Sequence, residues 1–173
     1  MSSEDAQLTF ADQFGRHLSR QYGMPPIAGR VAGWLLICEP PRPTVAELAA
    51  ALHASRTAVS GAVASLERLA LVQRSRAAGE RADRVAVDPT LGSQSLDDPT
   101  EYVALAALAR RGLETLGDAP PSRRARLLEL AALADFLVER SPVWAAEWRE
   151  RRDALRASGE LPDGPDTLVR SSP

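Results

Sequence analysis

Apolar residues recur at helical spacing along most of the chain, in segments separated by glycine and proline. The pattern predicts helices on either side of a central region: residues 6–22, 26 or 27 to 38, 98 or 99 to 116, 122–140 and 142–157. The segment 31–38 is apolar nearly all round, so its helix should lie buried between neighbours. Ser122 is the expected N-cap of its helix, and Ser141-Pro142 should end that helix and begin the next, because proline suits a first helical turn.

The central stretch from Thr44 to Asp88 carries the strongest local signals. Thr44 and Glu47 have the spacing of a capping box, in which each side chain bonds the backbone N–H of the other residue. Ser55 then follows a turn too short to be flexible, as the N-cap of a second helix. Inward-facing residues are predicted at helical spacing in both helices: Ala46, Leu48, Ala49 and Leu52 in the first, and Val59, Ala62, Val63, Leu66 and Leu69 in the second.

The second helix has an outer face that is rich in small and hydroxylated residues and nearly free of acidic side chains before Glu67. A helix that enters a major groove needs short side chains and hydroxyls near its N-terminus, where they approach bases and phosphates. The free N–H groups of residues 55–57, at the positive end of the helix dipole, add a site for one phosphate. The outward positions are Arg56, Thr57, Ser60, Gly61, Ala64 and Ser65.

An arginine-rich hairpin is predicted after these two helices. Residues 71–76 and 81–87 have the pattern of two strands, and Gly79 in the tip at 77–80 supplies the positive φ that a turn needs. Such a hairpin is usually a solvated surface, but its place directly after a helix-turn-helix favours nucleic-acid binding. It sets four arginines, Arg74, Arg76, Arg81 and Arg84, against the acids Glu80 and Asp83.

This central stretch resembles the winged helix-turn-helix of MarR-type bacterial regulators, and it is most similar to their GbsR-like branch. The residues that carry the resemblance are the run TVAELAAALHASRTAVSGAVASLERLALVQR and the GERADR that follows it. The resemblance covers residues 10–88. Many such turns carry glycine where this chain has His53 or Ala54, so the turn geometry should differ slightly. By position, the resemblance implies DNA contacts by Arg56, Thr57, Ser60, Gly61, Arg81 and Arg84.

The expected fold is mainly α, a winged helix-turn-helix with a two-stranded wing and additional N- and C-terminal dimerisation helices. The expected regions are residues 1–43 (core and dimerisation), 44–88 (DNA binding), 96–157 (dimerisation) and 158–173 (a disordered tail, because it is poor in apolar residues). The terminal helices can bury their apolar stripes only against each other or against a second copy. A homodimer fits a two-fold DNA site. The full expected DNA-binding set is Thr44, Ser55, Arg56, Thr57, Ser60, Gly61, Arg74, Arg76, Arg81 and Arg84.

Charge is distributed unevenly along the 173 residues. The net charge is −2, yet seven arginines stand against four acids between Arg42 and Arg84, so the basic part lies where a duplex would bind. All 21 basic residues are arginine, which we attribute to a GC-rich genome rather than to selection for arginine chemistry. One cysteine, no signal peptide and no long apolar run indicate a cytoplasmic protein without a membrane segment.

Catalytic chemistry is nearly missing from the sequence. Two histidines, His17 and His53, and one cysteine cannot form a zinc cluster, and no phosphate-binding or nucleophile motif occurs. We therefore expect no enzyme activity, metal or cofactor. His53 is expected to be partly packed in its turn rather than to contact phosphate. The apolar setting of Cys38 predicts a raised pKa and an inert thiol rather than a redox sensor.

A small apolar effector is a further partner implied by the resemblance, because similar regulators often hold such a ligand beside the winged lobe. The alternative, slightly favoured, is that the candidate residues simply fill the core, since they offer one polar group and ligand sites normally have a few. The candidates are Phe14, Leu18, Trp34, Cys38 and Tyr102.

The function predicted from these signals is that of a homodimeric, sequence-specific transcriptional regulator, a repressor, that binds double-stranded DNA. The main alternative is a winged helix that docks another protein through its arginines. The outer face of the second helix favours DNA, because docking helices usually present bulky apolar anchors and this helix has none.

Overall fold

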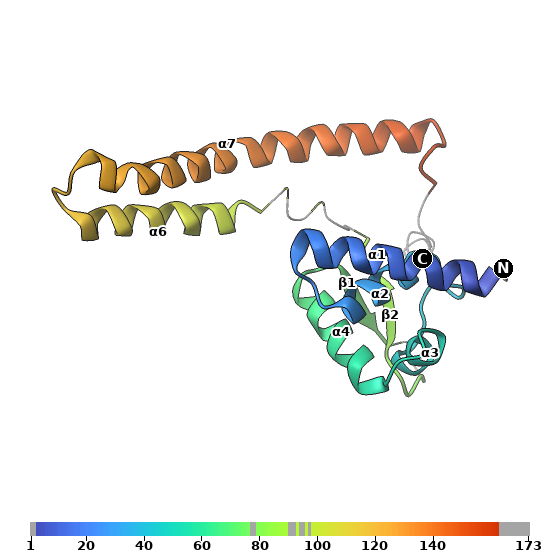
Figure 1. Ribbon diagram of the computed structural model, residues 1–173. Coiled ribbons are helices and arrows are strands. Elements are labelled where there is room, and N and C mark those ends of the chain that lie inside the picture. Colours follow the sequence, from blue (N-terminus) through green and yellow to red (C-terminus); the bar gives the residue numbers. More distant parts are fainter. Residues whose placement is uncertain (1–2, 77–78, 90–92, 94–95, 97, 163–173) are drawn as a thin grey trace. The chain divides into compact units, whose positions relative to one another are not determined.

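The computed structural model describes residues 3–76, 79–89, 93, 96 and 98–162. The described residues up to Pro89 form one compact unit, here called the winged lobe, and those from Ser93 onward form a second, the helical hairpin. The mainly α fold with a two-stranded wing is confirmed. The winged lobe contains α1 (Ser3–Tyr22), α2 (Pro26–Leu35), α3 (Val45–Ala51), α4 (Arg56–Arg68), β1 (Val72–Ser75) and β2 (Arg84–Val87), and the hairpin contains α6 (Thr100–Leu116) and α7 (Pro121–Ala157) (Figure 1).

Helix α2 lies at the centre of the winged lobe. Seven of its ten residues are buried, as its apolar sequence predicted, because α1 packs on one side of it and α4 on another. The prediction that this helix reaches Cys38 is wrong by three residues. The N–H groups of Ile37 and Cys38 both bond the carbonyl of Trp34, at 3.0 and 2.9 Å, and this turn leads into the proline-rich connector, which bends at residues 39–42 and contains a cis Glu39-Pro40 peptide bond.

A glycine crossing brings α1 and α2 into backbone contact. A Cβ atom on Gly29 would lie 2.7 Å from the Cα atom of Gly15, which is closer than side-chain carbons approach a backbone. The two helices can therefore lie this near each other only because residue 29 has no side chain. Beside the crossing, Arg30 Nε donates a 2.5 Å hydrogen bond to the carboxylate of Asp12 and ties α2 to α1.

Helices α3 and α4 begin at the two predicted N-caps. Thr44 Oγ1 accepts from the Glu47 N–H at 3.2 Å while Glu47 Oε2 accepts from the Thr44 N–H at 2.7 Å, and Ser55 Oγ accepts from the Ala58 N–H at 3.1 Å. Between the helices, His53 has φ 51°, the left-handed conformation that glycine adopts most easily. The side chain of His53 is exposed, which corrects the expectation that it packs within the turn.

The buried stripes of α3 and α4 follow the predicted spacing with two exceptions. Leu69 is 58% exposed, because α4 ends at Arg68 and helical spacing no longer sets the direction of the next side chain. Ala46 is exposed on the first turn of α3, on the side away from the core. The buried members are Leu48, Ala49, Leu52, Val59, Ala62, Val63 and Leu66.

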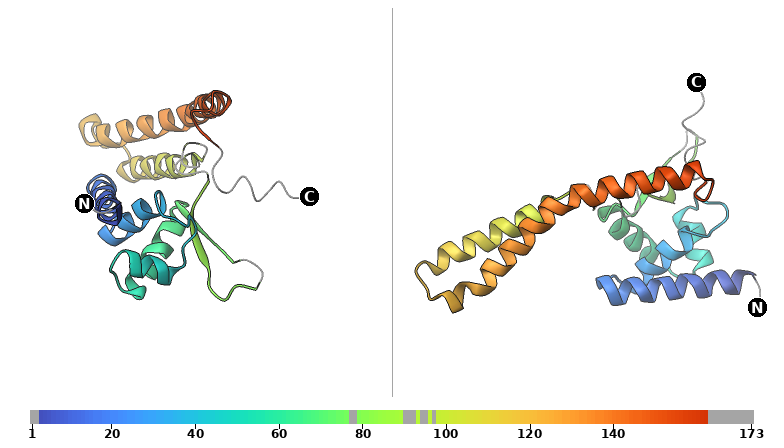
Figure 2. Two further views of the ribbon diagram at one scale, coloured as in Figure 1. Left: turned by 90° about the vertical axis from the view of Figure 1, so that its right-hand side faces the viewer. Right: turned by 90° about the horizontal axis from the view of Figure 1, so that it is seen from above.

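The wing is an antiparallel pair of short strands that leads away from the helices (Figure 2). Val72 and Val85 are buried, so one face of the ribbon packs on the core of the lobe. On the edge of β2 that does not pair with β1, the Val85 N–H donates to the carbonyl of Pro43 at 2.8 Å, so the connector before α3 pairs with the wing. Both strands are shorter than predicted, because residues 81–83 bend away from the ladder; residues 77–78 of the predicted tip lie outside the described part.

The helical hairpin packs α6 against α7 through small residues. A Cβ atom on Gly112 would meet Leu127 Cδ1 at 2.9 Å, and Arg110 Nη2 lies 2.6 Å from Asp135 Oδ2 across the two helices. No helix in the part of the chain that the structure describes has both the length and the apolar character to cross a membrane. The buried side chains of this interface are Ala106, Ala109, Ala131 and Ala134.

Two predicted helix boundaries in the hairpin are wrong. Helix α7 begins at Pro121 without a side-chain cap, so Ser122 lies inside its first turn. The predicted break at Ser141-Pro142 is a continuous helix, because proline removes one N–H donor and bends a helix without necessarily ending it. Beside the proline, the Ser141 hydroxyl donates to the Leu137 carbonyl at 2.6 Å. Of the tail predicted to be disordered, residues 158–162 form a turn after α7, and residues 163–173 lie outside the described part.

The glycine crossing predicts opposite effects for two Gly→Ala substitutions. Gly29→Ala should lower the free energy of unfolding by about 1–3 kcal/mol, because the new methyl group overlaps the backbone of α1. Gly61→Ala is the matched control, since a Cβ there meets nothing within 4 Å in the interior of α4; it should raise stability by roughly 0.5–1 kcal/mol. Urea unfolding followed by circular dichroism measures both changes, and shifts of the same sign would contradict the packing described.

Candidate nucleic-acid interface

The outer face of α4 is open to solvent. The other elements of the lobe pack against its inner face, where Val59 and Val63 are fully buried. On the outer face Arg56 and Thr57 are exposed and Ser60 is half-buried, and the first turn contains no acidic residue. The helix therefore presents one guanidinium group and two hydroxyl groups at its N-terminal end.

Gly61 lies in the middle of this face and has no structural reason to be glycine. A Cβ atom at this position would have nothing within 4 Å. Its φ is not in the left-handed region, and glycine inside a helix costs up to about 1 kcal/mol relative to alanine. The absence of a side chain at Gly61 therefore makes the fold less stable and leaves the surface of α4 flat.

The two N-cap residues of the predicted DNA-binding set are bonded within their own helices. Thr44 is held in the capping box of α3, and Ser55 Oγ is occupied by the Ala58 N–H. Hydrogen bonds from Thr44 also lower the pKa of Glu47, so its carboxylate stays ionised at neutral pH. The phosphate site at residues 55–57 stays a prediction that uses the free backbone N–H groups of the first turn.

Three of the four wing arginines are paired with acids of the winged lobe, Arg74 and Arg76 with one acid each. Arg74 Nε lies 3.1 Å from Glu67 Oε2, and Arg76 Nε lies 2.7 Å from Asp83 Oδ1. The hydrogen bond from Arg76 lowers the pKa of Asp83, so this pair is ionised at neutral pH. The positive charge counted from the sequence is thus partly neutralised within the lobe.

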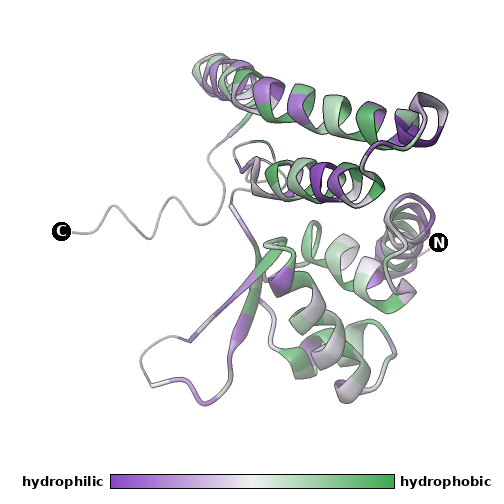
Figure 3. Cartoon of the chain, turned by 90° about the vertical axis from the view of Figure 1, so that its left-hand side faces the viewer, coloured by the Kyte–Doolittle hydropathy of each residue, from purple (hydrophilic) through white to green (hydrophobic). Residues whose placement is uncertain are grey.

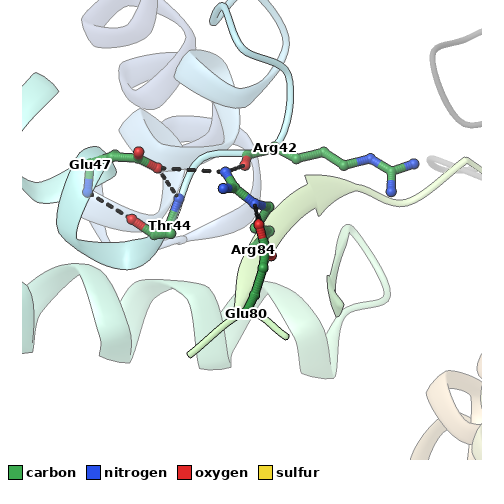
Figure 4. Close-up of polar contacts among 5 residues, drawn as sticks. All are labelled: Arg42, Thr44, Glu47, Glu80 and Arg84. Atoms are coloured by element: carbon green, nitrogen blue, oxygen red, sulfur yellow. Dashed lines mark hydrogen bonds and ion pairs between the residues drawn. The ribbon is translucent and has the colours of Figure 1, made fainter. Parts of the chain in front are cut away.

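The other two wing arginines, Arg81 and Arg84, have opposite surroundings. Arg84 Nε donates to both carboxylate oxygens of Glu80, at 2.8 and 3.1 Å, and Arg84 Nη1 donates to the carbonyl of Arg42 at 3.0 Å (Figure 4). The side chain of Arg81 is exposed and forms no hydrogen bond or ion pair with the described residues. Of the wing arginines predicted to bind DNA, Arg81 is therefore the one whose guanidinium group is directly available.

Sequence reasoning did not identify the acids that hold Arg84. Glu80 stands four residues before Arg84, but outside a helix this spacing carries no expectation of contact. Glu47, whose Oε2 lies 4.0 Å from Arg84 Nη1, comes from another element of the lobe. Only the folded connection between the wing and α3 brings these residues together.

Family comparisons agree with this geometry. A model described as MarR family matches residues 22–82, and one described as MmpR5-like MarR family transcriptional regulator matches residues 93–151. The HTH-type transcriptional regulator MmpR5 of Mycobacterium tuberculosis (strain ATCC 25618 / H37Rv) is 33% identical over 138 residues, which cover 79% of this chain and 83% of that protein. The chain belongs to the MarR family of transcriptional regulators. A solved structure described as a transcriptional regulator is also similar, with a TM-score of 0.75 and 29% identity over 84% of this chain and 99% of that one.

The five residues predicted to line an effector crevice in this MarR-family protein are divided between the two units of the structure. Phe14, Leu18 and Cys38 are half-buried and pack against the core of the winged lobe, and Trp34 is buried in that core. Tyr102 lies on α6, in the helical hairpin. Four of the five therefore lie in or against the core of the winged lobe, and the effector crevice stays a prediction. An open surface depression of about 290 Å³ lies over the exposed polar side chains Gln13, Arg16, His17, Arg20 and Gln21 of α1.

Cys38 has the chemistry expected of a structural cysteine. Burial raises the pKa of its thiol, and the nearby charge of Glu39 raises it further. Its Sγ atom lies 3.9 Å from the carbonyl oxygen of Leu35, within the turn that ends α2. A thiol is nucleophilic as the thiolate, so the raised pKa disfavours redox sensing by this regulator.

The raised pKa predicts slow alkylation of Cys38. Near pH 8 the thiolate fraction of the folded protein should be smaller than that of the unfolded chain, so iodoacetamide should react several-fold more slowly with the folded form. Mass spectrometry of the modified protein with and without denaturant measures the two rates. Equal rates would contradict the buried environment.

Proposed function

We propose that this MarR-family regulator binds duplex DNA as a homodimer in the cytoplasm and represses transcription. In the proposal, α4 enters the major groove and Arg81 of the wing contacts the phosphate backbone or the minor groove. The observation that carries the proposal is the solvent-exposed outer face of α4, which has no acidic residue in its first turn and no large apolar side chain. The inner face of the same helix is buried in the core of the lobe, so the helix is held in place.

Gly61 supports a close approach of DNA to α4. Since the fold gains nothing from glycine at this position, the missing side chain is best explained by a ligand that needs the space. The backbone of a groove-bound helix comes nearest to the bases where its side chains are smallest. We propose that Gly61 sets the depth at which α4 enters the groove.

A small set of side-chain groups near the start of α4 would recognise the DNA sequence. The guanidinium group of Arg56 suits guanine, whose O6 and N7 accept two parallel hydrogen bonds. The hydroxyls of Thr57 and Ser60 can donate or accept and so fit several bases. Few groups in this set discriminate strongly, so we expect each half-site to have one strongly specified base pair beside less specific ones.

Docking to a protein is the alternative function. The wing arginines give protein docking less support than the sequence suggested, because Arg74, Arg76 and Arg84 are already paired with acids of the lobe rather than free to meet an acidic partner protein. The outer face of α4 also has no aromatic or large aliphatic side chain to fill a pocket on a partner. A DNA-binding assay distinguishes the two functions directly.

Homodimerisation is supported by the helical hairpin, whose fully buried apolar side chains are alanines while several of its large apolar side chains are exposed. Figure 3 shows hydrophobic segments along both α6 and α7. Exposed apolar side chains in this number mark a surface that another molecule covers. A second copy would meet them with an equally apolar surface. The exposed side chains are Val103, Leu108, Leu128, Leu133 and Phe136, each about half exposed.

Two finer expectations stay predictions. The GbsR-like branch is one of them, beside the MmpR5-like description matched by the C-terminal helices. A small apolar effector is the other, and the packing of Phe14, Leu18, Trp34 and Cys38 into the core gives it little support.

Two substitutions in α4 test the proposed DNA binding. Genomic fragments retained by the immobilised protein supply a duplex, and fluorescence anisotropy then measures its affinity. Ser60→Glu should weaken binding by at least roughly tenfold, because it places a negative charge against the duplex. Gly61→Ala should weaken binding although it stabilises the fold. The control Ser122→Glu adds the same charge to the first turn of α7 and should leave affinity unchanged; unchanged affinity in both α4 variants would exclude α4 as the reading helix.

A single charge in the exposed apolar surface tests the homodimer. The wild-type protein should sediment as a dimer, and Phe136→Glu should shift it to the monomer because it places a carboxylate in the proposed interface. Ser122→Glu again serves as the control and should remain dimeric. Sedimentation velocity at several concentrations measures the populations, and a monomeric wild-type protein would refute this part of the proposal.

A further inference from the structure

Arg84 joins three segments of the winged lobe that are separate in the sequence. Its guanidinium group bonds the carboxylate of Glu80 in the wing loop and the carbonyl of Arg42 in the connector before α3. The same group lies 4.0 Å from the carboxylate of Glu47, which closes the capping box of α3 by accepting from the Thr44 N–H at 2.7 Å (Figure 4). We call this set of contacts the wing latch.

The backbone around Arg84 strengthens the same connection. Arg84 is the first residue of β2 and forms an isolated bridge with Thr44, and the next N–H, that of Val85, donates to Pro43 at 2.8 Å. The base of the wing is thus held to the start of α3 by main-chain contacts as well as by the guanidinium group. Because α3 is joined to α4 by a tight turn, the latch relates the wing to α4.

A wing of two four-residue strands needs such support. An isolated two-stranded ribbon is marginally stable in water, so its orientation depends on what holds its base. Charge-assisted hydrogen bonds are stronger than neutral ones, and the paired geometry of Nε with both Glu80 oxygens fixes direction as well as distance. Arg81 belongs to the loop that these bonds hold, three residues before Arg84.

We propose that Arg84 is a positioning residue for DNA binding rather than a DNA contact. It holds the wing loop on α3 so that the exposed guanidinium group of Arg81 is presented at a fixed distance from α4. This inference rests on the proposed function. It replaces the sequence-based expectation that Arg84 itself reaches the duplex, because its Nε and Nη1 atoms donate to Glu80 and to the carbonyl of Arg42.

The two roles predict opposite effects of Glu80→Gln. If Arg84 contacted phosphate, this substitution would release its guanidinium group and remove a negative charge beside the duplex, so affinity would rise. If Arg84 acts through the latch, the substitution loosens the wing loop, and affinity should fall several-fold although the protein has become less acidic. Fluorescence anisotropy with a mixed-sequence duplex at low salt measures the change, since wing contacts to phosphate do not depend on sequence.

Arg84→Lys and Arg81→Ala separate charge from geometry. Lysine keeps the charge but cannot form the bonds to Glu80 and Arg42 together, so the latch predicts that Arg84→Lys also weakens binding. Arg81→Ala should lower the slope of log affinity against log salt by about one in the wild-type background. In the Glu80→Gln background it should have little further effect, because the loop is no longer held. Full additivity of these two substitutions would overturn the latch.

Two controls keep the outcomes distinct. Gly29→Ala weakens the lobe away from the wing and should leave the salt slope unchanged, which separates positioning from general loss of stability. Hydrogen exchange at the Val85 amide tests the latch without DNA: Glu80→Gln should increase its rate, and an unchanged rate would refute the latch. If the wild-type protein binds no duplex, the proposed function fails, while the exchange result still decides whether Arg84 holds the wing.

Discussion

Small residues at the helix crossings are the constraint on which the structure depends. The crossing of Gly15 and Gly29 lets α1 lie directly on α2, and alanines fill the contact between α6 and α7. Interiors built this way are close-packed by backbone and methyl groups, so they are sensitive to each added carbon atom. Several large apolar side chains of the hairpin, such as Leu108 and Phe136, are left exposed. The same constraint therefore determines both what holds each unit together and which surface it offers to a partner.

The charge that a nucleic acid would meet is smaller than the charge that the sequence contains. Seven arginines and four acids occupy the region from Arg42 to Arg84, but the acids stand next to particular arginines rather than apart from them. Long-range attraction to DNA depends on the net charge, while specific contact depends on which guanidinium group is unoccupied. In this lobe the exposed groups of Arg56 and Arg81 combine both properties.

Local chemistry could be predicted from the sequence, and contacts between distant segments could not. The capping box at Thr44 and the buried face of α4 follow from spacing within a few residues, and both occur as expected. The bond from Arg84 to the carbonyl of Arg42 joins residues 42 positions apart, and nothing in the sequence pairs them. The break expected at Pro142 does not occur, since the loss of one hydrogen bond does not by itself end a helix of 37 residues.

The left-handed turn at His53 has a consequence for how this motif varies between proteins. A side chain in this conformation costs about 1–2 kcal/mol relative to the right-handed region. Glycine avoids that cost, but it also gives the unfolded chain more freedom, which removes roughly 0.4–1 kcal/mol of stability. The strain is the larger of the two effects, so His53 leaves the turn somewhat less stable than glycine would, by up to about 1.5 kcal/mol, and the fold tolerates that cost. A search that requires glycine between the two helices would therefore overlook helix-turn-helix proteins built like this one.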